Sequence, residues 1–239
     1  MAQTINRREV LKAGLTAAGL AMGVPVFAQQ QTETIIRNGL IVNESGRMEA
    51  DVRIRGEKIA EIGRNLAAGS GAREIEAQRM LLLPGAVDTH THLIAELPKP
   101  PQPNANTDDY ASGSSAALAG GATTISNFIP MLPGEEANAY ADRVIGQIQK
   151  TGIADFFIHV NMGNDPAPFT RAMFDKLADR GFVSTGEDFL ARASFDEHAV
   201  GWYKAFKASG QAGVLSMLHC EDYPIMAEAQ DTLMAEGKG

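Results

Sequence analysis

Two histidines separated by one residue, His90 and His92, are the strongest chemical signal in the sequence. They follow an apolar run and the pair Pro84-Gly85, in a stretch whose pattern predicts a short β-strand. Side chains two positions apart on a strand point the same way, so the two imidazoles are expected to lie side by side. Neutral imidazole is the commonest protein ligand for zinc and similar ions. The spacing therefore predicts half of a metal site; the alternative is a pair of solvated residues at a strand end.

A third histidine, His219, ends another apolar segment, which begins at Val214. Side chains at the carboxyl ends of parallel strands form the active sites of (β/α) barrels, so His219 is a candidate ligand from a second strand. The alternative is a surface histidine at a strand end. The neighbouring Cys220 is interpreted as a small buried residue rather than as a ligand or nucleophile.

Three more polar residues lie within expected elements. Asn127, near the end of a strand pattern, is predicted to face the pocket and bind substrate. His159 lies inside a strand pattern, where a histidine with satisfied hydrogen bonds is the more usual role. His198 lies on a helical surface pattern and is predicted to be solvated.

The elements that must position these side chains divide the chain into two parts. Residues 34–82 contain short alternating segments separated by turns, which predicts a small all-β unit. After it, strand and helix patterns alternate. Strands are expected at 81–89, 123–129, 155–161, 181–187 and 213–218, and helices at about 108–119, 135–150, 167–179, 195–209 and 224–236.

Alternating units of this length imply an α/β fold with a parallel sheet. The His-X-His at the carboxyl end of the first strand favours a (β/α) barrel over an open doubly wound sheet. A complete barrel has eight units and about 250 residues, whereas about five units are expected over residues 83–239. The sequence therefore predicts a partial (β/α)8 barrel, interpreted as the N-terminal part of a longer, truncated enzyme. The alternative is a complete small α/β protein.

The motif in residues 83–92, Leu-Pro-Gly-Ala-Val-Asp-Thr-His-Thr-His, resembles the signature of the cyclic amidohydrolases. That family includes dihydropyrimidinase, hydantoinase, allantoinase and dihydroorotase. Residues 34–63 resemble the β-sandwich segment that flanks its barrel, and residues 213–222 resemble its His-Ala-Glu-Asn segment. The resemblance covers residues 34–239. It implies that His90 and His92 bind one metal and His219 a second, with zinc as the cofactor, as one or two divalent ions.

The sequence departs from the family on the fourth barrel strand. Hydantoinases have a carboxylated lysine there that bridges two metals, whereas residues 181–190 contain no lysine. Glu187 falls near that position and is predicted to replace the bridge, with Asp188 as the weaker candidate. The alternative is that both acids are solvated and the site holds one metal or none. The hydantoinase tyrosine is also missing, and Ile94 stands where dihydroorotases have a substrate-binding arginine.

The resemblance implies hydrolysis of C–N bonds in small cyclic amides or imides. The family's remaining histidine and its aspartate base are expected beyond Gly239, so the catalytic base is unassigned and the chain alone is expected to have little activity. The full-length form is expected to be a homo-oligomer. The alternatives are another amidohydrolase chemistry, such as a deacylase or an imine or aryl hydrolase, or a catalytically dead, dihydropyrimidinase-related assembly protein.

The N-terminus predicts export. Arg7-Arg8 begins a twin-arginine pattern, an Ala/Gly-rich apolar run follows, and cleavage is expected after Ala28. Residues 1–28 are therefore predicted to be a signal peptide that directs the protein to the periplasm, with no membrane partner after cleavage. The formal net charge of -8 argues against nucleic acid as a partner. The single cysteine excludes an intrachain disulfide.

Overall fold

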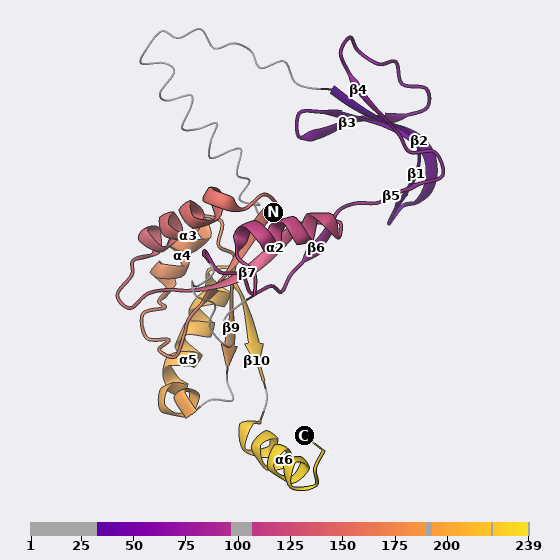
Figure 1. Ribbon diagram of the computed structural model, residues 1–239. Helices are drawn as coiled ribbons and strands as arrows, with labels where there is room; N and C mark the ends of the chain where they lie inside the picture. The colour runs from indigo at the N-terminus through magenta and orange to yellow at the C-terminus, as the bar shows by residue number, and fades with distance from the viewer. Residues whose placement is uncertain (1–32, 97–106, 190–192, 221, 239) are drawn as a thin grey trace, which may run out of the picture. The chain divides into compact units, whose positions relative to one another are not determined.

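A computed structural model describes residues 33–96, 107–189, 193–220 and 222–238 (Figure 1). The predicted signal peptide, residues 1–28, lies outside the described residues. The chain divides after Gly85 into two compact units. Among the described residues, no helix combines the length and the apolar character needed to cross a membrane.

The first unit is a five-stranded sheet, as the all-β pattern predicts. Strand β1 pairs antiparallel with β2 and parallel with β4 and β5, and β2 pairs antiparallel with β3. Strand β1 contains a bulge between Ile36 and Gly39, where Asn38 has a φ of 56°. The strands are β1 (Glu33–Asn43), β2 (Gly46–Arg55), β3 (Lys58–Gly63), β4 (Arg73–Glu76) and β5 (Leu81–Leu82).

Asp51 fixes this bulge. Its side chain is buried, and its two oxygens accept main-chain N–H groups from Asn38 at 2.9 Å and from Leu66 at 3.0 Å. The Arg37 guanidinium also contacts Asp51 at 3.0 Å. The hydrogen bond from Asn38 is the largest influence that holds the pKa of Asp51 below its usual value, and the bond from Leu66 and the Arg37 charge act in the same direction against burial. Asp51 is therefore ionised at neutral pH and ties three segments together.

The second unit is a five-stranded parallel sheet in the order β10-β9-β8-β7-β6, with helices between the strands. This alternation confirms the mixed α/β fold and the partial barrel in its coarse form. The elements are β6 (Ala86–Asp88), α2 (Tyr110–Ala119), β7 (Ala122–Pro130), α3 (Ala137–Thr151), β8 (Asp155–Asn161), α4 (Arg171–Asp179), β9 (Ser184–Phe189), α5 (Ala193–Gln211), β10 (Leu215–His219) and α6 (Tyr223–Ala235).

The core of this unit lies between the helices and one face of the sheet. Figure 1 shows α3, α4 and α5 along that face. Their buried side chains include Tyr140, Phe174 and Trp202, which belong to one cluster with Ile158 and Val160 of β8. Side chains on a strand alternate between faces, so every second residue of β8 points to the opposite face, which we call the inner face.

The predicted strand over residues 81–89 is wrong in its extent. Leu81–Leu82 pairs with β1 in the first unit, whereas β6 contains only Ala86–Asp88. Pro84 lies between them and has no N–H to donate to a ladder, which explains the interruption. His90 and His92 therefore follow the strand rather than lie on it.

Candidate metal centre

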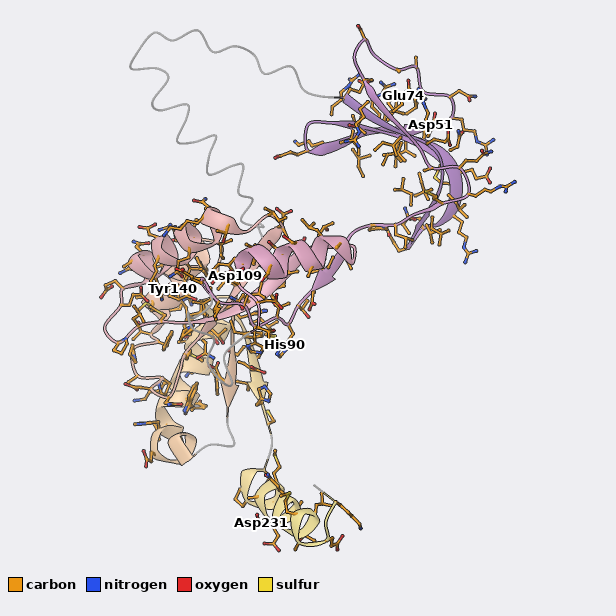
Figure 2. The ribbon with its side chains drawn as sticks, in the orientation of Figure 1. Asp51, Glu74, His90, Asp109, Tyr140 and Asp231 are labelled. Atoms are coloured by element: carbon orange, nitrogen blue, oxygen red, sulfur yellow. The ribbon has the colours of Figure 1, made fainter. Side chains whose placement is uncertain are left out.

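Four predicted ligands gather at the carboxyl ends of the parallel strands. His90 and His92 follow β6, Glu187 lies near the end of β9, and His219 is the last residue of β10. Figure 2 labels His90, which lies below α2 in that view. Because all five strands run the same way, their carboxyl ends share one edge of the sheet, and side chains distant in sequence meet there.

The donor atoms lie close together. The Nε2 atoms of His90 and His92 are 3.3 Å apart. Glu187 Oε1 lies 3.2 Å from His90 Nε2, and Glu187 Oε2 lies 3.4 Å from His92 Nε2. His219 Nε2 makes a short contact with Glu187 Oε1. One carboxylate thus touches three imidazoles that come from two other strand ends.

These distances between donor atoms suit an ion with tetrahedral coordination. Zinc ligands at about 2.0–2.1 Å in tetrahedral geometry lie roughly 3.4 Å from one another. Donor atoms of His90, His92 and Glu187 all lie within 4.8 Å of each other, and His219 joins this group through the carboxylate. The nitrogen and oxygen donors, their spacing and their charge therefore fit a divalent transition metal.

Glu187 differs from the histidines of this group in burial and in charge. The Glu187 side chain is 13% exposed, whereas those of His90 and His92 are about half exposed. Burial raises the pKa of Glu187, but the hydrogen bond with His219 and the charges of the three imidazoles outweigh it and leave the pKa below its usual value. The carboxylate is therefore ionised at neutral pH, as a metal ligand must be.

Asp188, the weaker candidate, points away from this group. It is buried, and its Oδ1 accepts the main-chain N–H of Met162 at 3.3 Å. Burial is the main cause that raises the pKa of Asp188 to about 7. Of the two neighbouring acids, the structure brings Glu187 alone to the histidines.

Asn127 does not lie among the ligands. Its side chain is fully buried and hydrogen-bonds to both main-chain groups of Leu93 and to the Tyr110 hydroxyl. The adjacent Phe128 instead faces the imidazoles, with ring centroids 4.7 Å from His90 and 5.2 Å from His92. A substrate contact by Asn127 stays a prediction.

His159 supports the centre from the inner face. Its ring stacks on Phe128 at 4.6 Å, and its two nitrogens contact Ser184 Oγ at 2.7 Å and the Thr89 carbonyl at 3.2 Å. Burial is the main cause that lowers the pKa of His159, so the ring is neutral at physiological pH. The sequence marks His159 as a satisfied strand histidine but does not reveal its contact with the residue before His90.

Two other predictions have opposite outcomes. Cys220 is exposed, so its interpretation as a buried residue is wrong. It follows β10, which ends the strand order of the described sheet and leaves the next residue open to solvent. His198 is exposed as predicted, at a kink within α5.

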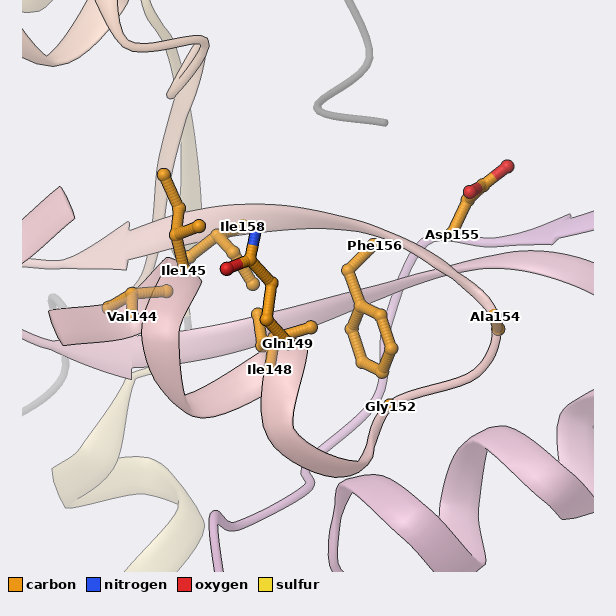
Figure 3. Close-up of a pocket in the computed structure, with 9 residues that line it drawn as sticks. All are labelled: Val144, Ile145, Ile148, Gln149, Gly152, Ala154, Asp155, Phe156 and Ile158. Carbon is orange, nitrogen blue, oxygen red and sulfur yellow. The ribbon is translucent and has the colours of Figure 1, made fainter. Parts of the chain in front are cut away.

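A small cavity between α3 and β8 is not a second candidate for a substrate site. Its walls include the apolar side chains of Val144, Ile148 and Phe156 (Figure 3). Its volume of about 30 Å³ suits a water molecule or two but not the ring of a cyclic amide.

Comparisons with known proteins find relatives of this chain, although no family model matches it. Dihydropyrimidinase of Dictyostelium discoideum is 30% identical over 209 residues, which cover 87% of this chain and 41% of that protein. D-hydantoinase of Geobacillus stearothermophilus is 30% identical over 188 residues, 79% of this chain and 39% of that protein. A crystal structure of D-hydantoinase superposes with a TM-score of 0.70 at 27% identity, covering 87% of this chain and 44% of the other. The chain thus spans about two fifths of the length of these relatives.

Proposed function

We propose that this chain, a homologue of the N-terminal portion of the cyclic amidohydrolases, carries the metal-binding residues of an enzyme that hydrolyses C–N bonds in cyclic amides or imides. One observation carries the proposal: Glu187 lies among imidazoles delivered from separate strand ends. The two curated relatives above are named for dihydropyrimidines and hydantoins, which are small cyclic amides. We propose this class as the substrate.

Zinc, as one or two ions, is the proposed metal, because imidazole and carboxylate are ligands it commonly takes. When bound, such an ion polarises a carbonyl group and lowers the pKa of water. His90, His92, Glu187 and His219 would hold it. The chain's own contribution is to hold these donor groups in the state and position that metal binding requires. Glu187 is held ionised, and neutral His159 contacts the Thr89 carbonyl, which precedes His90.

Glu187 takes the place of the bridging carboxylated lysine in this proposal. Its two oxygens contact different imidazoles, Oε2 that of His92 and Oε1 those of His90 and His219. A glutamate carries one negative charge on two hard oxygens, as a lysine carbamate does. The difference is that a glutamate is complete without carbon dioxide.

The test begins with metal content. The purified chain, loaded with zinc and dialysed, should retain one or two ions, and the double variant His90→Ala/His92→Ala should lose at least one. Wild-type protein without a bound transition metal would contradict the proposal. It would favour the second candidate, a metal-free relative with an assembly role.

Turnover is measured separately. A panel of hydantoin, dihydrouracil, acyclic N-acyl compounds and aryl or imine substrates distinguishes the proposed chemistry from a deacylase or another hydrolase. We expect little turnover of any substrate by this chain alone, since the resemblance places the family's aspartate base outside residues 1–239. Hydrolysis at ordinary enzymatic rates, roughly 1–10³ per second, would contradict that expectation.

Periplasmic localisation and assembly of the full-length form into a homo-oligomer also remain proposals. The Arg7-Arg8 pair supports twin-arginine export. Replacing both arginines by lysine should retain the protein in the cytoplasm, as cell fractionation would show. Equal export of the variant would contradict the proposed route.

A further inference from the structure

The residue after His92 is held by its main chain. Leu93 donates its N–H to Asn127 Oδ1 at 2.9 Å, and its carbonyl accepts a hydrogen bond from Asn127 Nδ2 at 2.9 Å. Asn127 is fully buried, and its amide can satisfy both groups at once because it carries a donor and an acceptor. One side chain thus fixes both peptide groups of Leu93.

The side chain of Leu93 is held from α2. A Cβ atom built at Gly113 would lie 2.9 Å from Leu93 Cδ1 and 3.2 Å from Leu93 Cγ, and closer still to Leu93 Cδ2. Real Cβ atoms essentially never come within 3.0 Å of another atom, so the methyl groups of Leu93 occupy the space that the missing side chain of Gly113 leaves open. Close packing against Leu93 therefore explains why position 113 of α2 is a glycine.

These contacts act beside the metal ligands. Thr91 Oγ1 donates a short hydrogen bond to the Ser126 carbonyl, so residues 91 and 93 are both attached to β7. His90 and His92 alternate with them and project towards Glu187. Metal–ligand distances tolerate errors of only about 0.2 Å. A shift of Leu93 would pass directly to His92 through one peptide bond.

We propose that Asn127 and Gly113 are positioning residues for the metal site, acting through Leu93 on His92 and His90. This inference rests on the proposed metal function. It assigns Asn127 a role in holding the ligands rather than in touching substrate. The competing explanation is that both residues merely stabilise the fold.

The first comparison pairs Asn127→Leu with Tyr140→Phe. The leucine keeps the volume of the side chain but removes both hydrogen bonds to Leu93. Tyr140→Phe is the matched control, because it removes a buried hydrogen bond to the Ile129 carbonyl, also on β7, at 2.8 Å. Zinc dissociation constants are measured by chelator competition on the full chain. We expect about a 10- to 100-fold rise for Asn127→Leu and an unchanged value for Tyr140→Phe.

The second comparison pairs Gly113→Ala with Gly146→Ala. Both replace a helical glycine, but a Cβ at Gly146 meets nothing within 4 Å. Alanine favours a helix over glycine, so Gly146→Ala should raise the melting temperature and leave zinc binding unchanged. Gly113→Ala should weaken zinc binding about tenfold, the lower end of the range for residues that support metal ligands. If Asn127→Leu does not fold, the comparison of Gly113→Ala with Gly146→Ala, which are smaller changes, still tests the positioning role.

A readout without metal separates the two hypotheses. The imidazole ¹H–¹³C NMR signals of His90 and His92 in the metal-free protein should shift in Asn127→Leu and Gly113→Ala but not in the controls. Failure of wild-type protein to bind zinc would refute the proposed function, while these signals would still test positioning. If both variants lower the melting temperature and leave the zinc affinity and the histidine signals unchanged, the inference is overturned.

Discussion

Replacing Glu187 by glutamine tests the centre directly. Glutamine keeps the size of the side chain and one carbonyl oxygen but removes the negative charge that contacts His90, His92 and His219. Four-ligand zinc sites bind with roughly 10–16 kcal/mol. One ligand of four is then worth on the order of 3 kcal/mol, or about a 100-fold change in the dissociation constant. The three histidines remain, so weakened rather than abolished binding is expected.

The assay is zinc titration against a competing chelator at neutral pH. Asp188→Asn is the control, because it makes the same acid-to-amide change at the adjacent residue, whose side chain contacts Met162 instead. Its zinc affinity should stay within about threefold of wild type, well below the tenfold change that 1.4 kcal/mol produces. Equal affinities for Glu187→Gln and wild type, or an equal loss in both variants, would refute the role assigned to Glu187.

Three further outcomes are expected. Asp51→Ala should destabilise the first sheet by about 2–3 kcal/mol, since buried donors lose their acceptor. Because the pKa of Asp51 is lowered in the folded protein, this stabilisation is present above the usual carboxyl pKa and is lost as the pH falls through the folded-state pKa. Hydrogen exchange of the β1 amides, measured against pH, would check this. Zinc binding by wild type should not respond to bicarbonate, whereas Glu187→Lys should require it; bicarbonate dependence in wild type would argue against a ready-made glutamate bridge. Cys220 is exposed and should react with a thiol reagent in the native protein, and protection until unfolding would contradict the structure.

Local patterns were sufficient for part of the fold and the site. The His-X-His spacing and the apolar segment ending in His219 can each be recognised within a short stretch of sequence. The structure places all three imidazoles in contact with Glu187. The alternation of strands and helices likewise follows from local periodicity. The first strand was misjudged because the apolar residues before and after Pro84 look continuous, although they pair in different sheets.

Which face a residue occupies could not be predicted for β7. Residues 125–129 are all buried, because helices cover one face and ring side chains fill the other. A strand buried on both faces lacks the polar–apolar alternation that would set its phase. Asn127 was therefore predicted to face the pocket, whereas Phe128 is the residue whose ring lies against the imidazoles of His90 and His92.

The choice between Glu187 and Asp188 depends on a bulge that no local pattern shows. Ser184 lies on the inner face, where its hydroxyl contacts His159, so strict alternation would place Asp188 there and turn Glu187 towards the helices. Four residues of β9, from Thr185 to Asp188, instead lie opposite three of β10, from Ser216 to Leu218. The extra residue inverts the alternation and delivers Glu187 to the histidines. Gly186, with a φ of 145°, lies at this point, in a conformation that other residues rarely adopt. The metal site thus depends on a backbone irregularity as much as on the identity of its ligands.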